Sequence, residues 1–376
     1  MISMGYAAGG GAGRDGGGDC AKTVCAGPRA NGFAARLWPP ILGQERVRSG
    51  DIGMKNLAIL GAGAVGGWLA GGLARAGLDV GLVARGATLV ALRRDGLVVR
   101  QDGREERFAV RAGSAEELGP QDVVVLAVKA HDLPAAIGSL APLLGPDTAV
   151  VSAMNGLPWW FFAGHEGPLA APLEGVDPGG AIGRAVEAGR VVGAVAHMGA
   201  RVVSPGVVQV AKVDRLLIGE PAGGGSARVG ELVAAFRAGG VEARASDAIR
   251  QEIWVKLWGN SNMNPLSALT GATIEGMLDD PDVRSLVKAM MVEFLAVGER
   301  IGLPIAMAVE ERIAVTRRLG PIKTSMLQDV EAGRTLETGP LLGVLVEIAE
   351  RLDMVVPHLR GILVLVRLMD ANRRRP

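Results

Sequence analysis

The sequence predicts an α/β domain built on a parallel sheet, followed by an all-α domain. Two observations lead to this prediction. Between residues 57 and 153, short apolar runs alternate with helical stretches, as in parallel strands joined by helices. From Asp247 onward the strand signals stop, and apolar residues recur at spacings of three and four, as on the buried face of a helix. We therefore expect one domain over residues 54–246 and a second over residues 247–376.

The elements of the first domain are expected from their local patterns. Short apolar runs are the expected strands, at 57–60, 80–84, 123–128 and 149–153. Helical periodicity marks the expected helices, at 65–76, 88–95, 133–144 and 228–238. Asp102-Gly103 favours a two-residue turn, so residues 96–111 are expected to form a β-hairpin. A strand-rich stretch at 194–218 contains another turn, at Ser204-Pro205-Gly206.

The second domain is expected to consist of helices separated by prolines. Apolar residues at helical spacing mark three of them, at 249–263, 283–301 and 341–352. Five prolines divide this region, each expected in a first helical turn or just after a helix: Pro265, Pro281, Pro304, Pro321 and Pro340.

A glycine-rich loop lies between the first expected strand and the first expected helix, the context that a dinucleotide-binding GxGxxG loop requires. Its first glycine allows a tight turn, the second lets the backbone approach a pyrophosphate, and the third lets the helix pack on the strand. The phosphates would lie at the helix N-terminus, which favours anions. The expected cofactor-binding residues are Gly61, Ala62, Gly63, Ala64, Val65 and Gly66. A Rossmann-type domain follows from this interpretation, whereas the alternative is a glycine-rich packing turn.

The residue after the second expected strand indicates which dinucleotide binds. Sites that prefer NAD usually carry an acid there, which bonds the ribose 2′-hydroxyl. This chain carries Arg85, whose guanidinium is suited to the 2′-phosphate of NADP. NADPH is therefore the expected cofactor, and the alternative is that Arg85 is a solvated charge at a strand end.

Three polar residues four apart lie on one expected helix of the second domain: Lys256, Asn260 and Asn264. Each four-residue step turns the facing direction by only ~40°, so one ammonium and two amides share a stripe. Amides inside an apolar helix need partners when they are buried, which suggests a polar cavity. A solvated helix face is the alternative.

With these residues in view, the chain resembles the ketopantoate reductases, the NADPH enzymes of pantothenate synthesis, from residue 55 to about residue 368. The glycine loop and Arg85 match the family's cofactor residues. Lys129 matches its lysine near the nicotinamide, and Asn155-Gly156 matches a turn whose amide reaches both cofactor and substrate. The resemblance thus implies that Lys129 and Asn155 bind the cofactor and that Asn155 also binds the substrate.

The resemblance also implies a reaction and its residues. The family's Lys…Asn…Asn helix falls on the Lys256 stripe, its Ser-Met-Leu-Gln-Asp segment begins at Ser325, and its glutamate is Glu337. NADPH would deliver hydride to the C2 carbonyl of a 2-oxo acid, with Lys256 as the general acid. Glu337 would hold the substrate hydroxyl or orient Lys256. The remaining substrate-binding residues would be Asn260, Asn264 and Ser325.

Two segments depart from the family pattern and keep alternatives open. After Glu337 the chain reads Thr-Gly-Pro-Leu-Leu-Gly, and after Asn155-Gly156 it has an aromatic run at 157–162. Reduction of 2-dehydropantoate (ketopantoate) to pantoate is the leading function, and a paralogous reductase of another branched 2-oxo acid or imine is the alternative. A non-catalytic NADPH-binding sensor is a third hypothesis, but a sensor would need the glycine loop and Arg85 without Lys256 and Glu337.

Charge and composition exclude other classes of function. The 376 residues include 40 Lys and Arg against 39 Asp and Glu, so the basic excess of nucleic-acid binders is lacking. The four histidines show no ligand spacing, and we expect no metal. No continuous apolar run indicates a membrane span or a secretory signal, so we expect a cytoplasmic protein. The oligomeric state stays open, with a homodimer as one possibility.

The first part of the chain, residues 1–53, is rich in glycine and arginine and has no period of a strand or helix. We expect a disordered extension, or an upstream stretch translated from a wrongly chosen start. Both cysteines of the chain, Cys20 and Cys25, lie there, and a metal or redox role for them is the alternative.

Overall fold

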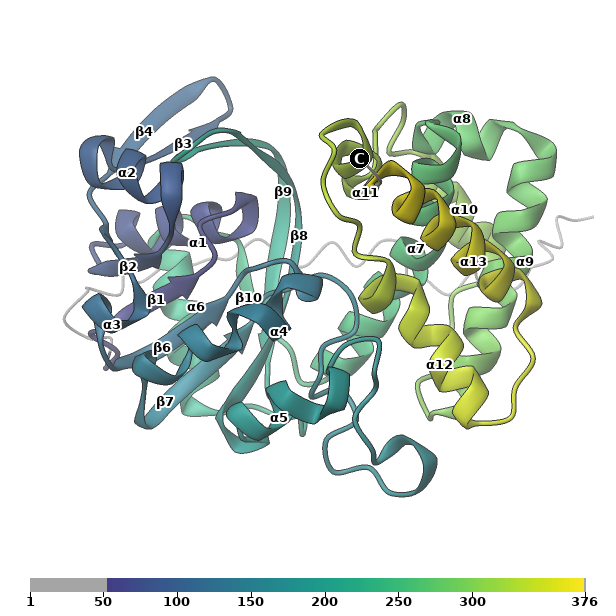
Figure 1. Ribbon diagram of the computed structural model, residues 1–376, viewed down its shortest axis with the longest axis horizontal. Coiled ribbons are helices and arrows are strands. Elements are labelled where there is room, and N and C mark those ends of the chain that lie inside the picture. The colour runs from purple at the N-terminus through teal and green to yellow at the C-terminus, as the bar shows by residue number, and fades with distance from the viewer. Residues whose placement is uncertain (1–52, 375–376) are drawn as a thin grey trace, which may run out of the picture. The chain divides into compact units, whose positions relative to one another are not determined.

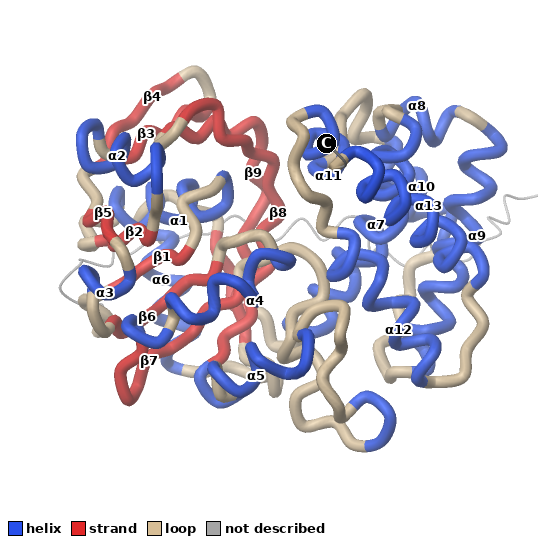
Figure 2. Tube along the Cα trace, in the orientation of Figure 1, coloured by secondary structure: helices blue, strands red, loops and turns tan. Residues whose placement is uncertain are grey.

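The computed structural model describes residues 53–374. The predictions for the N-terminal extension, Cys20 and Cys25 lie outside these residues, except for Gly53. The described part of the chain has the predicted fold class, a Rossmann-like sheet-and-helix domain followed by a helical domain (Figures 1 and 2). The strands end with β10 (Ala243–Ala245), and the first long helix of the second domain begins at Ile249, which supports the proposed division after residue 246.

One ten-stranded sheet organises the first domain, in the order β4-β3-β9-β8-β7-β6-β1-β2-β5, with β10 paired to β9. Five strands at one side of it are mutually parallel: β1 (Leu57–Leu60), β2 (Val80–Val83), β5 (Arg111–Gly113), β6 (Gln121–Leu126) and β7 (Leu144–Ser152). The predicted hairpin is β3 (Leu97–Gln101) with β4 (Arg104–Phe108), and the predicted strand-rich stretch is the antiparallel pair β8 (Val191–Ser204) and β9 (Val207–Gly219).

Alternating side chains of the parallel strands pack into two separate hydrophobic cores, because successive residues of a strand face opposite sides of the sheet. Leu57 and Ile59 of β1 point into the core under the first-domain helices. Ala58 and Leu60 point the other way, into a core that continues through Trp254 into the second domain. All four β1 residues are buried, which explains why the sequence shows a continuous apolar run there.

The first-domain helices are α1 (Ala64–Arg75), α2 (Gly86–Asp95), α3 (Ala115–Leu118), α4 (Leu133–Ala136), α5 (Ala181–Ala185) and α6 (Ala227–Ala238). The predicted helix over residues 133–144 is wrong. Only α4 is α-helical, and 3₁₀ turns at Ile137–Ser139 and Ala141–Leu143 follow it. Pro142 lacks an N–H and its ring would clash with the carbonyl of Gly138 in an α-helix, which disfavours a continuous helix here.

After β10 the described chain contains only helices and loops. Its α-helices are α7 (Ile249–Thr270), α8 (Ile274–Asp279), α9 (Pro281–Arg300), α10 (Val309–Arg317), α11 (Ser325–Glu331), α12 (Val344–Arg351) and α13 (Pro357–Arg373). A π-helical turn, Gly339–Gly343, leads into α12. Pro281 begins α9 as predicted, with Asp280 capping it. Pro265 was predicted at a helix boundary, but it lies inside α7, where burial on neighbouring helices outweighs the lost hydrogen bond.

None of the described helices is both long enough and apolar enough to cross a membrane.

Candidate active site

The glycine loop leaves a helix N-terminus open. Gly61 has φ +113°, and a Cβ there would lie 2.7 Å from the Val128 nitrogen. A Cβ on Gly66 would lie 2.0 Å from the Gly61 carbonyl oxygen, so both positions exclude side chains. At Gly63 a Cβ would meet nothing within 4 Å, and the first turn of α1 has neither a side-chain cap nor an acid. The uncapped N–H groups of this turn therefore fit the pyrophosphate of a dinucleotide.

Arg85 is free to bind a ligand. It is exposed at the N-cap of α2, directly after β2, and its guanidinium makes no hydrogen bond or ion pair with any other described residue. Gly86, with φ +56°, lets the chain turn into the helix beside it. The position at the carboxyl end of a parallel strand next to the glycine loop is the one expected for a residue that contacts the adenosine ribose.

Lys256 is held by two oxygen atoms of the first domain. Its Nζ donates to Asn155 Oδ1 at 2.7 Å and to the Ala196 carbonyl oxygen at 2.8 Å. Asn155 follows β7 and Ala196 lies inside β8, so the ammonium lies where the end of β7 and the interior of β8 meet α7. Burial lowers the pKa of Lys256 to about 8, although the nearby Glu337 carboxylate opposes this shift. Lys256 and Asn155, which were predicted separately, are therefore in direct contact.

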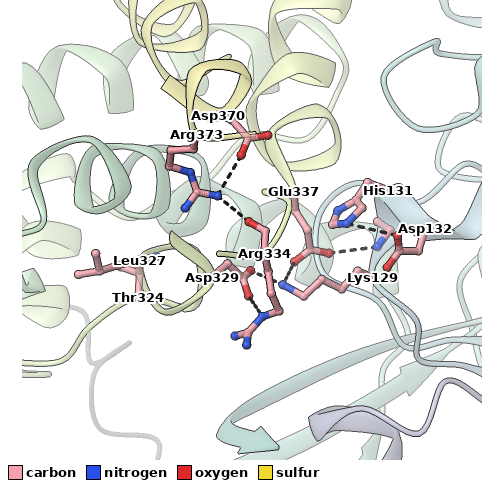
Figure 3. Close-up of polar contacts among 11 residues, drawn as sticks. Lys129, His131, Asp132, Thr324, Leu327, Asp329, Arg334, Glu337, Asp370 and Arg373 are labelled. Atoms are coloured by element: carbon pink, nitrogen blue, oxygen red, sulfur yellow. Dashed lines mark hydrogen bonds and ion pairs between the residues drawn. The ribbon is translucent and has the colours of Figure 1, made fainter. Parts of the chain in front are cut away.

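Glu337 and Lys129 meet in a second group of charges (Figure 3). Lys129 Nζ forms an ion pair with Asp329 and lies 3.9 Å from Glu337 Oε2, while the Ala130 N–H donates to Glu337 Oε1 at 3.1 Å. Glu337 is only 5% exposed. Burial raises the pKa of Glu337, and the charge of Lys129 limits the rise. The contacts join the loop after β6 to α11 and the segment that follows it, and so bridge the two domains.

Asp329 is a further residue of the site, and its role was not predicted from the sequence. It lies in the Ser-Met-Leu-Gln-Asp segment, but its partner Lys129 is 200 positions away in the chain. Asp329 is 3% exposed and also accepts from Arg334 Nε at 2.8 Å. The helical pattern around Asp329 does not reveal that its carboxylate is buried between two cations, because one of them, Lys129, is far away in the sequence. The Ala196 carbonyl was missed for another reason, since backbone groups leave no residue-type signal.

The other predicted substrate residues are less connected. Asn264 is buried, Asn260 is half-buried, and neither carboxamide bonds to another described residue. Ser325 is exposed at the start of α11, and its hydroxyl has no hydrogen-bond partner among residues 53–374; the helix is capped by Thr324. No other described residue therefore uses the donors and acceptors of these three side chains.

The aromatic run after Asn155-Gly156 belongs mainly to the core. Trp160 and Phe161 are almost completely buried, and the Phe161 ring lies 6.1 Å from that of Trp254 in α7. Trp254 in turn packs on Phe294 of α9, with ring centroids 4.3 Å apart. These ring contacts pack the segment after Asn155 against α7 and α9 of the helical domain.

His197, next to Ala196, is a neutral neighbour of Lys256. Burial lowers the pKa of His197 to about 4, and the charges of Lys256, Arg215 and Arg312 add to the effect. Within residues 53–374, no group of three or more His, Cys, Asp or Glu side chains is arranged to hold a metal ion.

Comparison with known proteins places these residues in a family. The profile described as "Ketopantoate reductase PanE/ApbA" matches residues 57–223, and that of the family's C-terminal domain matches residues 248–370. A 2-dehydropantoate 2-reductase of Mesorhizobium japonicum is 45% identical over 85% of this chain and 98% of its own length. One of Halobacterium salinarum is 30% identical over 84% of this chain and 99% of its own. A ketopantoate reductase structure from Ralstonia solanacearum superposes with a TM-score of 0.81 at 46% identity, covering 85% of this chain and 99% of that one.

Proposed function

Since the chain belongs to the ketopantoate reductase PanE/ApbA family, we propose that it reduces 2-dehydropantoate (ketopantoate) to pantoate with NADPH. The observation that carries the proposal is the buried Lys256 ammonium, held by Asn155 and Ala196 beside a buried carboxylate. A dinucleotide-binding protein without catalytic function would have no need for such a group. It makes the sensor hypothesis the weaker one.

The residues of the first domain fit NADPH. The open N-terminus of α1 would hold the pyrophosphate, and unpaired Arg85 would hold the 2′-phosphate. When bound, NADPH supplies the hydride for the C2 carbonyl of the substrate. Lys129, fixed by Asp329, and Asn155 are the residues that we assign to the nicotinamide end.

Lys256 supplies the proton. An ammonium has three hydrogens, and two of them are donated to Asn155 Oδ1 and the Ala196 carbonyl. The third is left for the substrate's carbonyl oxygen, which becomes the hydroxyl oxygen of the product as the N–H bond breaks. With a pKa of about 8, Lys256 is mostly protonated at neutral pH and still acidic enough to give the proton up.

The unpaired polar groups near α7 would bind the rest of the substrate. Asn260, Asn264 and Ser325 offer amide and hydroxyl donors for the carboxylate and the hydroxyl of ketopantoate. Glu337 is the candidate acceptor for the hydroxyl, because its Oε1 is anchored by the Ala130 N–H and its position is therefore fixed. A site that bonds a hydroxyl discriminates strongly against an analogue without it.

The test is the initial rate of NADPH oxidation with ketopantoate, 2-oxoisovalerate and pyruvate. We expect the highest kcat/KM for ketopantoate, by up to ~10⁴–10⁵ over analogues without the hydroxyl. An equal or higher value for 2-oxoisovalerate would favour the paralogous reductase. NADPH binding without turnover of any 2-oxo acid or imine would favour the sensor.

Cofactor choice is tested with Arg85→Ala. A guanidinium on the 2′-phosphate contributes ~1.5–3 kcal/mol, or about one to two powers of ten in affinity. The KM for NADPH is expected to rise by this factor, with the KM for NADH nearly unchanged. Equal changes for both cofactors, or a parent enzyme that prefers NADH, would mean that Arg85 does not bind the phosphate.

A further inference from the structure

We propose that Arg373, at the end of α13, is a positioning residue of the reductase: it clamps the segment 330–336, whose two flanks are Asp329 and Glu337. The inference goes beyond the proposed function but rests on it for its kinetic test. Arg373 touches neither Lys129 nor Lys256 in any contact of the described residues, so it would act only through the segment that it holds.

The clamp is made by the two ends of one guanidinium, and Figure 3 shows the contacts of Arg373 with Arg334 and Asp370. Arg373 Nη1 donates to the Val330 carbonyl oxygen at 2.8 Å, and Nη2 donates to the Arg334 carbonyl oxygen at 2.7 Å. Nη2 also lies 3.2 Å from Oδ1 of Asp370, a carboxylate that is 5% exposed and one helical turn earlier in α13. Asp370 therefore aims the guanidinium at the two carbonyls.

The other hydrogen bonds of the segment are local: the N–H groups of Ala332, Gly333 and Arg334 donate to carbonyl oxygens of α11, and Lys323 forms an ion pair with Glu331. Residues 331–334 are exposed, and Gly333 has φ +67° in the turn after α11. The first well-buried apolar side chain after Val330 is Leu336. A turn with so little buried surface is held mainly by hydrogen bonds, and Arg373 supplies two that reach it from another helix.

Both flanks of the segment carry charges of the active site. At one end, Asp329 accepts a hydrogen bond from Arg334 Nε at 2.8 Å and forms an ion pair with Lys129. At the other end, Glu337 accepts a hydrogen bond from the Ala130 N–H. The charge of Glu337 also raises the pKa of Lys256, against the effect of burial. A segment that loosens would therefore move both carboxylates away from the lysines they face.

The direction of the effect on pH dependence follows from the groups around each carboxylate. Glu337 interacts with the charges of Lys129, His131 and Asp329, and Lys256 interacts with Glu337 and has neutral His197 as a neighbour. If Glu337 moves away, the charge that supports the protonated form of Lys256 weakens, so the pKa of Lys256 falls. Activity that needs protonated Lys256 would then be lost at a lower pH.

Arg374 offers a matched control. It is the neighbouring residue, and it binds the same carboxylate, with Nη2 3.1 Å from Asp370 Oδ2. Its Nε donates to the Asp370 carbonyl oxygen at 3.2 Å. No contact joins it to residues 330–336 among the described residues. Arg374→Ala therefore removes an arginine and an Asp370 ion pair and leaves the clamp intact.

The experiment compares Arg373→Ala, Arg373→Lys and Arg374→Ala with the parent, measuring kcat/KM for ketopantoate across a pH range that brackets about 8. Arg373→Ala is expected to lose about one to two powers of ten, the scale of a misplaced active-site group, and its basic limb should move to lower pH. Arg373→Lys, with a compact ammonium that cannot fork between two carbonyls, should lie between Arg373→Ala and the parent. Arg374→Ala should match the parent.

Parental activity and pH profile in Arg373→Ala would overturn the inference, as would an equal loss in Arg374→Ala. If Arg373→Ala does not fold, Arg373→Lys decides between the same outcomes. A readout without substrate separates this inference from the proposed function. It is the pH dependence of the acylation of Lys256 by an amine-reactive acylating reagent, measured by peptide mass spectrometry. A lower pKa of Lys256 in the Arg373 variants supports the clamp even if no 2-oxo acid is reduced, and an unchanged pKa contradicts it.

Discussion

Lys256 makes the proposed reduction sensitive to pH, because a general acid must be protonated before it can give its proton. Its pKa is lowered to about 8 by burial, with Glu337 limiting the fall. Since the protonated form is the active one, kcat/KM is expected to be level below pH 8 and to fall about tenfold per pH unit above it. His197, with a pKa of about 4, is neutral throughout this range and cannot account for the limb.

Substituting the lysine tests the same assignment. Lys256→Ala should lower kcat by ~10²–10⁴, the contribution of a positioned general acid, while NADPH binding stays near parental. The basic limb should disappear with the lysine. Rates at several pH values and a fluorescence titration with NADPH measure both effects. Turnover within about tenfold of the parent would remove Lys256 from the role of acid.

Among the elements, the π-helical turn Gly339–Gly343 closes over the Asn155 turn. The Leu157 N–H donates to the Pro340 carbonyl oxygen at 3.0 Å. Gly156 has φ +86°, and a Cβ there would lie 2.7 Å from the same oxygen. The segment after Glu337 that departs from the family pattern thus packs on the loop that carries Asn155. It therefore helps to hold Asn155 Oδ1, which accepts from Lys256.

Gly156→Ala is expected to disturb this contact. The unfavourable backbone conformation costs ~1–3 kcal/mol, and the collision with Pro340 adds to it. Gly164→Ala is the control, because Gly164 has φ +83° but a Cβ there meets nothing within 4 Å. Gly156→Ala should lower Tm more than Gly164→Ala and should also lower kcat, since Asn155 is its neighbour. Equal changes in the two variants would mean that the π-helical turn does not position Asn155.

Elements with a strong local pattern could be predicted from the sequence, and contacts between distant elements could not. The run 57–60 is apolar because both faces of the strand are buried, and the glycine loop is recognised by its three-glycine spacing between a strand and a helix, which are both local signals. The helix expected at 133–144 was wrong because apolar spacing was weighed above Pro142.

The candidate site divides in the same way. Helical spacing predicts that Lys256 and the two asparagines share one helix face, and the family resemblance adds their roles in the site. Asp329 and Arg373 do not, because their partners are far away in the chain: Lys129 lies 200 positions from Asp329, and Val330 lies 43 positions from Arg373. Their roles depend on which loops the fold brings together, and residue type does not encode that.

In the molecule as a whole, the first described residues are packed and hydrogen-bonded into the fold. Met54 is 8% exposed, and the N–H groups of Lys55 and Asn56 donate to Asp122 Oδ2 at 2.8 and 2.9 Å. Asp122 lies in β6, so these bonds hold the start of β1 beside its neighbouring strand. Similarity to the family begins at residue 57, close to the same point.

A chain that begins at Met54 is therefore expected to fold and to reduce ketopantoate like the full-length protein, with nearly the same Tm and kcat/KM. A chain that begins at Leu57 after an initiator Met is the contrast. It lacks the two N–H donors to Asp122 and the buried Met54 side chain. Each hydrogen bond to a charged acceptor contributes at most ~1.5–3 kcal/mol to the free energy of unfolding in this exposed setting. The Tm of this shorter chain should therefore be clearly lower. Calorimetry and initial rates on the three chains distinguish the cases. A large loss of stability or activity in the Met54 chain would show that residues 1–53 contribute to the folded enzyme, because the two chains would differ in nothing else.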